Sequence, residues 1–216
     1  MDFDASPAAV DDAPACGVEP LRDPRPLLRK TLDDWQRHHP GGDFWVFGYA
    51  SLIWRPEFAA AEQRRARVHG HHRALQMRSR INRGTPQVPG LVFALVAGGS
   101  CAGMVYRIER ARVEAEMQRL WDREMPTGVY DPKWLPCQTA QGPVRALAFT
   151  LSRSSPSYTG ELDDASLLGI LRHARGKFGS TLDYLVETGC CLRKHGIRDA
   201  TVERQLALAR AHGLVR

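Results

Sequence analysis

The sequence predicts an α+β fold, with a small mixed, largely antiparallel β-sheet or barrel, flanking helices and a helical C-terminal third. Short apolar runs separated by glycine- and proline-rich turns fill the first two thirds of the 216-residue chain. Apolar residues then recur at helical spacing across residues 163–216. Strands that come before helices, rather than alternating with them, favour an antiparallel sheet with segregated helices.

The N-terminal segment differs in composition from the rest of the chain. The first 20 residues hold five of the 24 acidic side chains and none of the 30 Lys and Arg. Prolines interrupt this segment, so we expect residues 1–23 to be a disordered acidic extension. A basic start followed by an apolar run is missing there, so no signal peptide is expected. Residues 24–216 are predicted to form a single domain.

The first elements of that domain follow from apolar spacing. A leading helix is predicted over residues 24–40, because Leu28, Leu32 and Trp35 recur at helical spacing before a Pro-Gly-Gly run. Residues 44–47 form a short continuous apolar run, which is typical of a buried strand.

Four more strands are expected in the first two thirds of the chain. Residues 67–79 and 87–97 are predicted strands separated by a turn-rich segment. A Gly-Gly-Ser hairpin turn is predicted to lead from the second of these into a strand at residues 101–108. The last predicted strand covers residues 144–151.

A helix is predicted over residues 110–124. An apolar stripe that starts at Val113 runs along it and, extended by one turn, meets Glu124. Prolines and a glycine recur from Pro126 to Pro136, which predicts a loop after the helix.

Glu124 is the candidate acid–base residue. Burial on the apolar stripe and the negative end of the helix dipole both disfavour its charged form and so raise its pKa. A carboxyl group of this kind suits general base and then general acid chemistry near neutral pH. The pattern is also compatible with an ion pair between Glu124 and Arg123, or a strand arginine, that only fixes the end of the helix.

The strand at residues 44–47 runs directly into Gly48, Tyr49, Ala50, Ser51 and Leu52. A glycine followed by small and polar residues lets successive backbone N–H groups point into one concavity. This segment therefore predicts a nest that binds a carboxylate, with an ordinary strand-to-loop turn as the alternative.

Other motifs fit their chemistry less well. Glycines at residues 98–103 have P-loop spacing, but Met104 stands where lysine is required. Ser51 lacks the flanking glycines of a nucleophile elbow, which leaves a Ser51–His hydrolase as a minor alternative. His69 and His71 would share one strand face as a possible metal pair. We favour their interpretation as polar strand residues and expect no metal site.

The charge balance raises the alternative of nucleic-acid binding. The net charge is +6, and all 30 basic residues lie beyond the acidic N-terminal segment. Seven arginines follow one another between residues 64 and 83: Arg64, Arg65, Arg67, Arg73, Arg78, Arg80 and Arg83. No aromatic residue lies among them to stack on bases. A solvated strand face is therefore the favoured interpretation.

The cysteine count and the hydropathy of the chain indicate the cellular compartment in which the protein is expected. The five cysteines are odd in number and form no C-x-x-C pair, which favours neither a disulfide framework nor a structural zinc site. The longest near-apolar run is too short to span a bilayer. We expect a cytoplasmic protein with no membrane partner.

Five short segments together resemble one known family. The first is similar to the F-G-Y-G-S-L-[IV]-W-[RK] signature of ChaC-like γ-glutamylcyclotransferases, and the others are similar to its R-G, P-G, R-E…G-Y and P-x-Y-x-G segments in order. The segments are Phe47-Gly48-Tyr49-Ala50-Ser51-Leu52-Ile53-Trp54-Arg55-Pro56, Arg83-Gly84, Pro89-Gly90, Arg123-Glu124 with Gly128-Val129-Tyr130, and Pro156-Ser157-Tyr158-Thr159-Gly160. The resemblance runs from about residue 44 to residue 185.

The resemblance implies a γ-glutamylcyclotransferase-like fold and a γ-glutamylcyclotransferase that cleaves glutathione to 5-oxoproline and Cys-Gly. The α-amine of the γ-glutamyl group would attack its own γ-carbonyl. Glu124 would take a proton from this amine and deliver it to the leaving nitrogen. The backbone from Gly48 to Leu52 would bind the substrate α-carboxylate, and Tyr130 and Tyr158 would help to define the pocket.

The implied enzyme needs no cofactor, because its nucleophile belongs to the substrate. The expected partner is this small substrate alone, bound by a monomer without nucleic acid. The nearest alternatives are a cyclotransferase for other γ-glutamyl amines or dipeptides and a basic nucleic-acid-binding protein. A cyclotransferase scaffold used for binding alone is the remaining alternative, because Ala50 and Val129 stand where the family has glycine.

Overall fold

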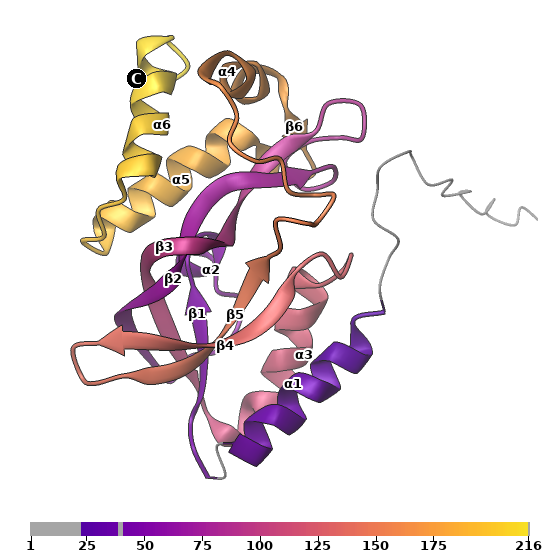
Figure 1. The fold of residues 1–216 in the computed structure, drawn as a ribbon, viewed down its shortest axis with the longest axis vertical. Coiled ribbons are helices and arrows are strands. Elements are labelled where there is room, and N and C mark those ends of the chain that lie inside the picture. The colour runs from indigo at the N-terminus through magenta and orange to yellow at the C-terminus, as the bar shows by residue number, and fades with distance from the viewer. Residues whose placement is uncertain (1–22, 39–40, 216) are drawn as a thin grey trace, which may run out of the picture.

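The computed structural model describes residues 23–38 and 41–215 (Figure 1). The predicted disordered extension lies almost wholly outside these residues. The elements are α1 (Arg25–His38), β1 (Phe44–Gly48), α2 (Ser51–Trp54), β2 (Glu62–Ser79), β3 (Gly90–Ile108), a 3₁₀ turn (Arg110–Arg112), α3 (Val113–Glu124), β4 (Asp131–Thr139), β5 (Val144–Leu151), α4 (Asp164–His173), β6 (Arg175–Gly176), β7 (Gly179–Ser180), α5 (Thr181–Lys194) and α6 (Ala200–Ala211).

Strands β1 to β5 form a closed barrel in the order β1-β3-β2-β4-β5. The largest part of the barrel is a long antiparallel ribbon of β2 and β3. Strand β1 pairs with the C-terminal half of β3. Strand β5 pairs antiparallel with β4 and closes the barrel through parallel pairing with β1 and β3. The prediction of a mixed, largely antiparallel sheet or barrel is therefore confirmed.

The core of the fold lies inside this barrel and beneath the helices that cover it. All five residues of β1 are buried, which explains their continuous apolar run. Phe47, Phe93 and Phe149 are among the largest fully buried side chains. Trp121 of α3 packs edge-on against Phe149 with ring centroids 5.5 Å apart, so the helix is fixed to the barrel.

The helices cover the barrel in two groups (Figure 1). Helices α1 and α3 lie side by side, and the Trp121 indole donates a hydrogen bond to the Pro24 carbonyl at 2.8 Å. The C-terminal helices α4, α5 and α6 form the second group, so the prediction of a helical C-terminal third is confirmed. Between α4 and α5, the short strands β6 and β7 form a hairpin that periodicity did not indicate.

The predicted hairpin turn at the Gly-Gly-Ser segment is wrong, because β3 continues through it. Gly98 and Gly99 lie opposite Gly70 of β2, where the register shifts between His69 and His71. All three glycines have positive φ angles (105°, 68° and 77°). They therefore form a bulge that bends the ribbon without ending either strand.

The loop predicted from Pro126 to Pro136 is wrong in its second half, where β4 begins at Asp131. Strand β4 pairs with β2 only from Cys137 to Thr139. Among the residues that the structure describes, no strand pairs with the part of β4 that carries Pro132 and Pro136 on the side away from β5, and proline is tolerated at such an edge because no N–H is required. On the opposite side of β4, Pro132 and Pro136 stand in register with Phe149 and Arg145 of β5.

Candidate active site

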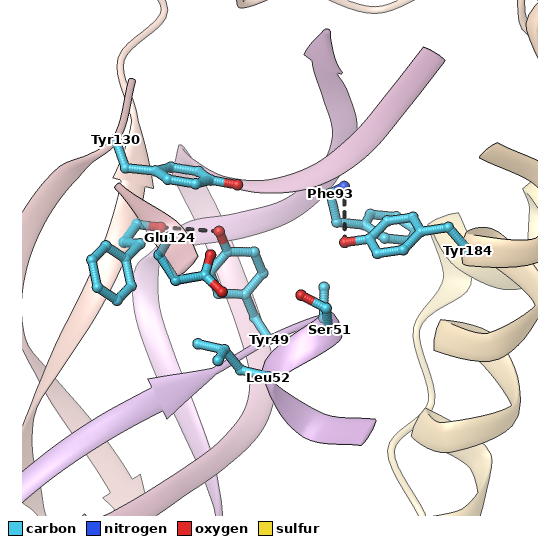
Figure 2. Close-up of a pocket in the computed structure, with 9 residues that line it drawn as sticks. Tyr49, Ser51, Leu52, Phe93, Glu124, Tyr130 and Tyr184 are labelled. Carbon is cyan, nitrogen blue, oxygen red and sulfur yellow. Dashed lines mark hydrogen bonds between the residues drawn. The ribbon is translucent and has the colours of Figure 1, made fainter. Parts of the chain in front are cut away.

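A cavity that is partly open to solvent, with about 270 Å³ of empty space including its open mouth, lies where α2, α3 and α5 meet strands β3 and β5. Its lining residues are Tyr49, Ala50, Ser51, Leu52, Phe93, Glu124, Tyr130, Phe149 and Tyr184. Figure 2 shows the Glu124 carboxylate pointing into this space toward Ser51, with the Tyr130 ring above it. Six residues that the sequence singled out for the site are therefore brought together, from three separate parts of the chain.

The floor of the cavity is the turn between β1 and α2. Helix α2 is a single turn, and the first backbone N–H groups of a helix have no acceptor within it. The amides of Ile53 and Arg55 are used internally, donating to the carbonyls of Ala50 and Ser51 at 2.8 Å. No hydrogen bond of the Ser51 and Leu52 amides is found within residues 23–38 and 41–215, and both residues line the cavity, so these N–H groups are available to a carboxylate.

Close packing explains two positions of this turn. A Cβ at Gly48 would lie 3.1 Å from both Leu52 Cβ and Tyr106 Cε2, so glycine favours the close approach of α2 and of the Tyr106 ring to the end of β1. Ala50 has a φ of −145°, outside the left-handed region, and its methyl group is buried. The departure from glycine at residue 50 therefore causes no left-handed strain.

A buried arginine braces the same turn from behind. Arg73 of β2 has a fully buried side chain that donates a hydrogen bond to the Tyr49 carbonyl. It also donates to the Ala102 carbonyl at 2.6 Å and forms an ion pair with Asp199. The interpretation of the seven arginines as a solvated strand face is therefore wrong for Arg73 and for Arg83, both of which are buried.

Glu124 is the last residue of α3, and its side chain is only 13% exposed. Burial raises the pKa of this carboxyl group, and the negative charge of Glu57 raises it further. Arg123 opposes both effects, since its Nε lies 3.0 Å from Glu124 Oε1. Glu124 therefore faces the cavity and also forms the predicted ion pair with Arg123, and its acid–base role stays a prediction.

Arg123 also contacts groups other than Glu124. Its Nη1 donates to the Arg55 carbonyl and lies 3.2 Å from Glu57 Oε2. Glu57 also pairs with the Arg55 guanidinium and has a positive φ of 56°, which is uncommon for a residue other than glycine. One guanidinium is thus shared by two carboxylates, and this limits how far it can lower the pKa of Glu124.

Three tyrosines, Tyr49, Tyr130 and Tyr184, line the cavity. The Tyr49 hydroxyl donates to the Phe149 carbonyl at 3.0 Å, and the Tyr184 hydroxyl accepts from the Phe93 amide at 3.3 Å (Figure 2). Burial raises the pKa of Tyr49 and of Tyr130 well above the usual range, and the nearby Glu124 charge adds to this. These phenols therefore stay neutral at physiological pH.

Two expected site residues lie outside the lining of this cavity. Gly48 sits just behind it, at the end of β1. Tyr158 forms a bridge with Met77 of β2, and its amide donates to the Ser155 carbonyl at 2.9 Å. A substrate contact by Tyr158 stays a prediction.

The sequence did not single out Phe93, Phe149 or Tyr184. The two phenylalanines belong to apolar strands, and Tyr184 recurs at helical spacing with core residues. Tyr184 reaches the cavity because α5 packs on α2, where the Trp54 and Tyr184 rings lie 6.2 Å apart. A long-range contact of this kind leaves no local signal.

Metal and membrane features are not found in the described part of the chain. Within residues 23–38 and 41–215, no group of three or more His, Cys, Asp or Glu side chains could hold a metal ion. No helix of these same segments has the length and apolar character needed to cross a bilayer. The cavity lining contains Ser51 but no histidine, so the minor alternative of a Ser51–His pair has no partner there.

Comparison with known proteins places the chain in one family. The family model described as ChaC-like protein matches residues 44–211. The glutathione-specific γ-glutamylcyclotransferase of Escherichia coli K12 is 34% identical over 73% of this chain and 69% of that protein. The human glutathione-specific γ-glutamylcyclotransferase 1 is 31% identical over 66% of each chain. The crystal structure of a yeast γ-glutamylcyclotransferase specific to glutathione has the same fold, with a TM-score of 0.72 and 18% identity over 78% of this chain and 96% of that one. The chain therefore belongs to the family of ChaC-like proteins.

Proposed function

We propose that this protein is a γ-glutamylcyclotransferase that cleaves glutathione to 5-oxoproline and Cys-Gly. The observation that carries the proposal is the buried Glu124 carboxyl group, with its raised pKa, lining one cavity together with the turn of Ser51 and Leu52. The names of the E. coli and human relatives support glutathione as the substrate.

The amides bind the substrate α-carboxylate, which directs the adjacent α-ammonium toward Glu124. The Glu124 carboxylate takes one proton from that ammonium. The freed amine then attacks the γ-carbonyl carbon and forms the new C–N bond of the five-membered ring. Glu124 returns the proton to the peptide nitrogen as the old C–N bond breaks. The ring nitrogen then loses its second proton through the same carboxylate to the leaving amine, so Glu124 is regenerated, 5-oxoproline is neutral at its ring nitrogen, and Cys-Gly leaves as an ammonium.

Positioning supplies most of the catalysis in this scheme. The nucleophile and the carbonyl belong to one molecule, and correct orientation of such groups can lower a barrier by about 7–11 kcal/mol. The turn from Gly48 to Leu52, braced by Arg73, holds one end of the substrate in a fixed place. Tyr130 and Tyr184 narrow the cavity around the other end.

This scheme calls for no cofactor, because the attacking group comes from the substrate and Glu124 handles the proton. We further propose that the enzyme acts in the cytoplasm as a monomer without nucleic acid, as expected from its sequence. Ala50 and Val129 leave substrate preference open among γ-glutamyl compounds, so a cyclotransferase for other γ-glutamyl amines is the alternative outcome.

The test is turnover of three substrates by the purified protein: glutathione, γ-Glu-Ala and γ-Glu-lysine. We expect 5-oxoproline and Cys-Gly in equal amounts from glutathione, and little product from the other two. A preference for γ-Glu-Ala or γ-Glu-lysine would contradict glutathione as the substrate. Failure to form 5-oxoproline from all three, together with salt-dependent retention on DNA, would instead favour nucleic-acid binding.

A further inference from the structure

The Arg83-Gly84 and Pro89-Gly90 segments have no role in the scheme above, yet the fold builds them into one unit. A Cβ at Gly84 would overlap the Gly90 nitrogen, and a Cβ at Gly90 would overlap the Arg83 carbonyl oxygen. Gly176 of β6 packs against the same place, since its Cβ would overlap the Gly84 nitrogen. Three stretches of backbone therefore meet with no side chain between them, and this contact fixes the position of Arg83.

The Arg83 side chain is nearly buried, with 8% of its surface exposed. Its Nη1 donates to the Phe178 carbonyl at 2.6 Å, which is the one hydrogen-bond acceptor of this guanidinium in the described part of the chain. The nearest carboxylate, that of Glu187, is 51% exposed and lies 3.8 Å away. Asp183 is engaged in capping α5, where it accepts a hydrogen bond from the Ser180 amide.

Arg83 is thus a nearly buried cation whose ion pair with the half-exposed Glu187, at 3.8 Å, is longer than a hydrogen bond. Burial lowers the pKa of this guanidinium despite the partial compensation by Glu187. A guanidinium placed in this way is prepared to receive an anion, and its planar fork of donors matches the two oxygens of a carboxylate.

The position of Arg83 relates it to the catalytic cavity. Its guanidinium carbon lies 5.0 Å from the centre of the Tyr184 ring, and Tyr184 lines the cavity together with Glu124. Burial raises the pKa of the Tyr184 hydroxyl, with Glu124 adding to this and Arg83 opposing it. Tyr184 therefore lies within electrostatic range of both groups, with Glu124 in the cavity and Arg83 against its ring.

We propose that Arg83 binds the C-terminal carboxylate of the leaving peptide and so selects γ-glutamyl peptides over γ-glutamyl amines. This inference rests on the proposed function of the same cavity. The leaving Cys-Gly is two residues long and spans about 7 Å when extended. With its γ-carbonyl at Glu124, the substrate would extend its far carboxylate along Tyr184, which lines the cavity and has the Arg83 guanidinium against its ring.

The test compares glutathione with its glycinamide, in which the far carboxylate becomes an uncharged carboxamide of the same size. The enzymes are the wild type, Arg83→Gln, Arg83→Lys and the control Arg193→Gln. Arg193 lies on α5 like Tyr184, but it pairs with Glu203 at 2.9 Å on the α6 side. The readout is kcat/KM for 5-oxoproline release, and circular dichroism monitors folding.

We expect the wild type and Arg193→Gln to prefer glutathione over its glycinamide by roughly 10- to 100-fold, the value of a charge-assisted hydrogen-bond pair. In Arg83→Gln, kcat/KM for glutathione should fall by this same factor while kcat/KM for the glycinamide stays unchanged, so the two values should agree within about 2-fold. Arg83→Lys should keep part of the preference for glutathione.

Three results would overturn the inference. The first is equal turnover of both substrates by the wild type, which needs no folded variant. The second is an unchanged preference in Arg83→Gln, and the third is an equal loss on both substrates, which indicates a structural role alone. Release of 5-oxoproline in these cases leaves the proposed function standing, whereas its absence from wild-type reactions would contradict both.

Discussion

Replacing Glu57 by Gln removes the negative charge that faces Glu124 across Arg123. Because this charge raises the pKa of Glu124, its removal should lower that pKa. In the proposed scheme Glu124 acts as a base in its ionised form, so the acidic limb of the pH profile of kcat/KM should move to lower pH. Arg123→Gln removes the opposing cation and should move the same limb to higher pH.

The size of the Glu57 effect follows from the geometry. Arg123 nitrogens lie 3.0 Å from the Glu124 oxygen and 3.2 Å from the Glu57 oxygen, which places the carboxylates about 7 Å apart across one guanidinium. The Glu57 side chain is 41% exposed, so an effective dielectric constant of roughly 40–80 applies. Coulomb's law then gives about 0.6–1.2 kcal/mol, or about 0.4–0.9 pH unit.

The assay is 5-oxoproline release from glutathione between pH 4.5 and pH 9, at about 0.1 M ionic strength to fix screening. Glu203→Gln serves as the control, because this exposed glutamate pairs with Arg193 far along α5. The reasoning fails if both variants move the acidic limb in the same direction, or if Glu57→Gln moves it no further than the control does.

Three glycine-related predictions concern the frame of the site. Ala50→Gly should leave kcat/KM within about 2-fold and cost at most about 1 kcal/mol in urea unfolding, because Ala50 has a φ of −145°. Gly48→Ala should lower the free energy of unfolding by about 1–3 kcal/mol and reduce kcat/KM, since the new Cβ would press on Leu52. Gly84→Ala should lower the unfolding free energy by about 3 kcal/mol or more through backbone overlap with Gly90, and an unchanged Tm would contradict this.

Local patterns in the sequence sufficed for the helix that carries Glu124. Apolar spacing along α3 placed this carboxyl group on the buried face, and the ion pair with Arg123 was one of its two interpretations. The apolar run of β1 likewise predicted a buried strand. These features depend on neighbours within about one or two turns of the chain, which the sequence displays directly.

Features that depend on distant partners were missed. Gly98 and Gly99 suggested a turn, because their bulge is defined by Gly70 on another strand. Pro132 and Pro136 suggested a loop, because only the pairing of β4 shows that no described strand needs an N–H from them on the side away from β5. Arg83 and Tyr184 come together through the packing of α5 on the barrel, which neither segment signals by itself.

Turnover by Glu124→Gln tests the central claim most directly. The change keeps the size of the side chain but removes its ability to carry a proton between nitrogens, and Glu114→Gln on the exposed side of α3 is the matched control. Glutathione cleavage by Glu124→Gln should fall by at least roughly 100-fold, with glutathione binding measured by calorimetry largely retained. Near-wild-type release of Cys-Gly by this variant would remove Glu124 from the mechanism.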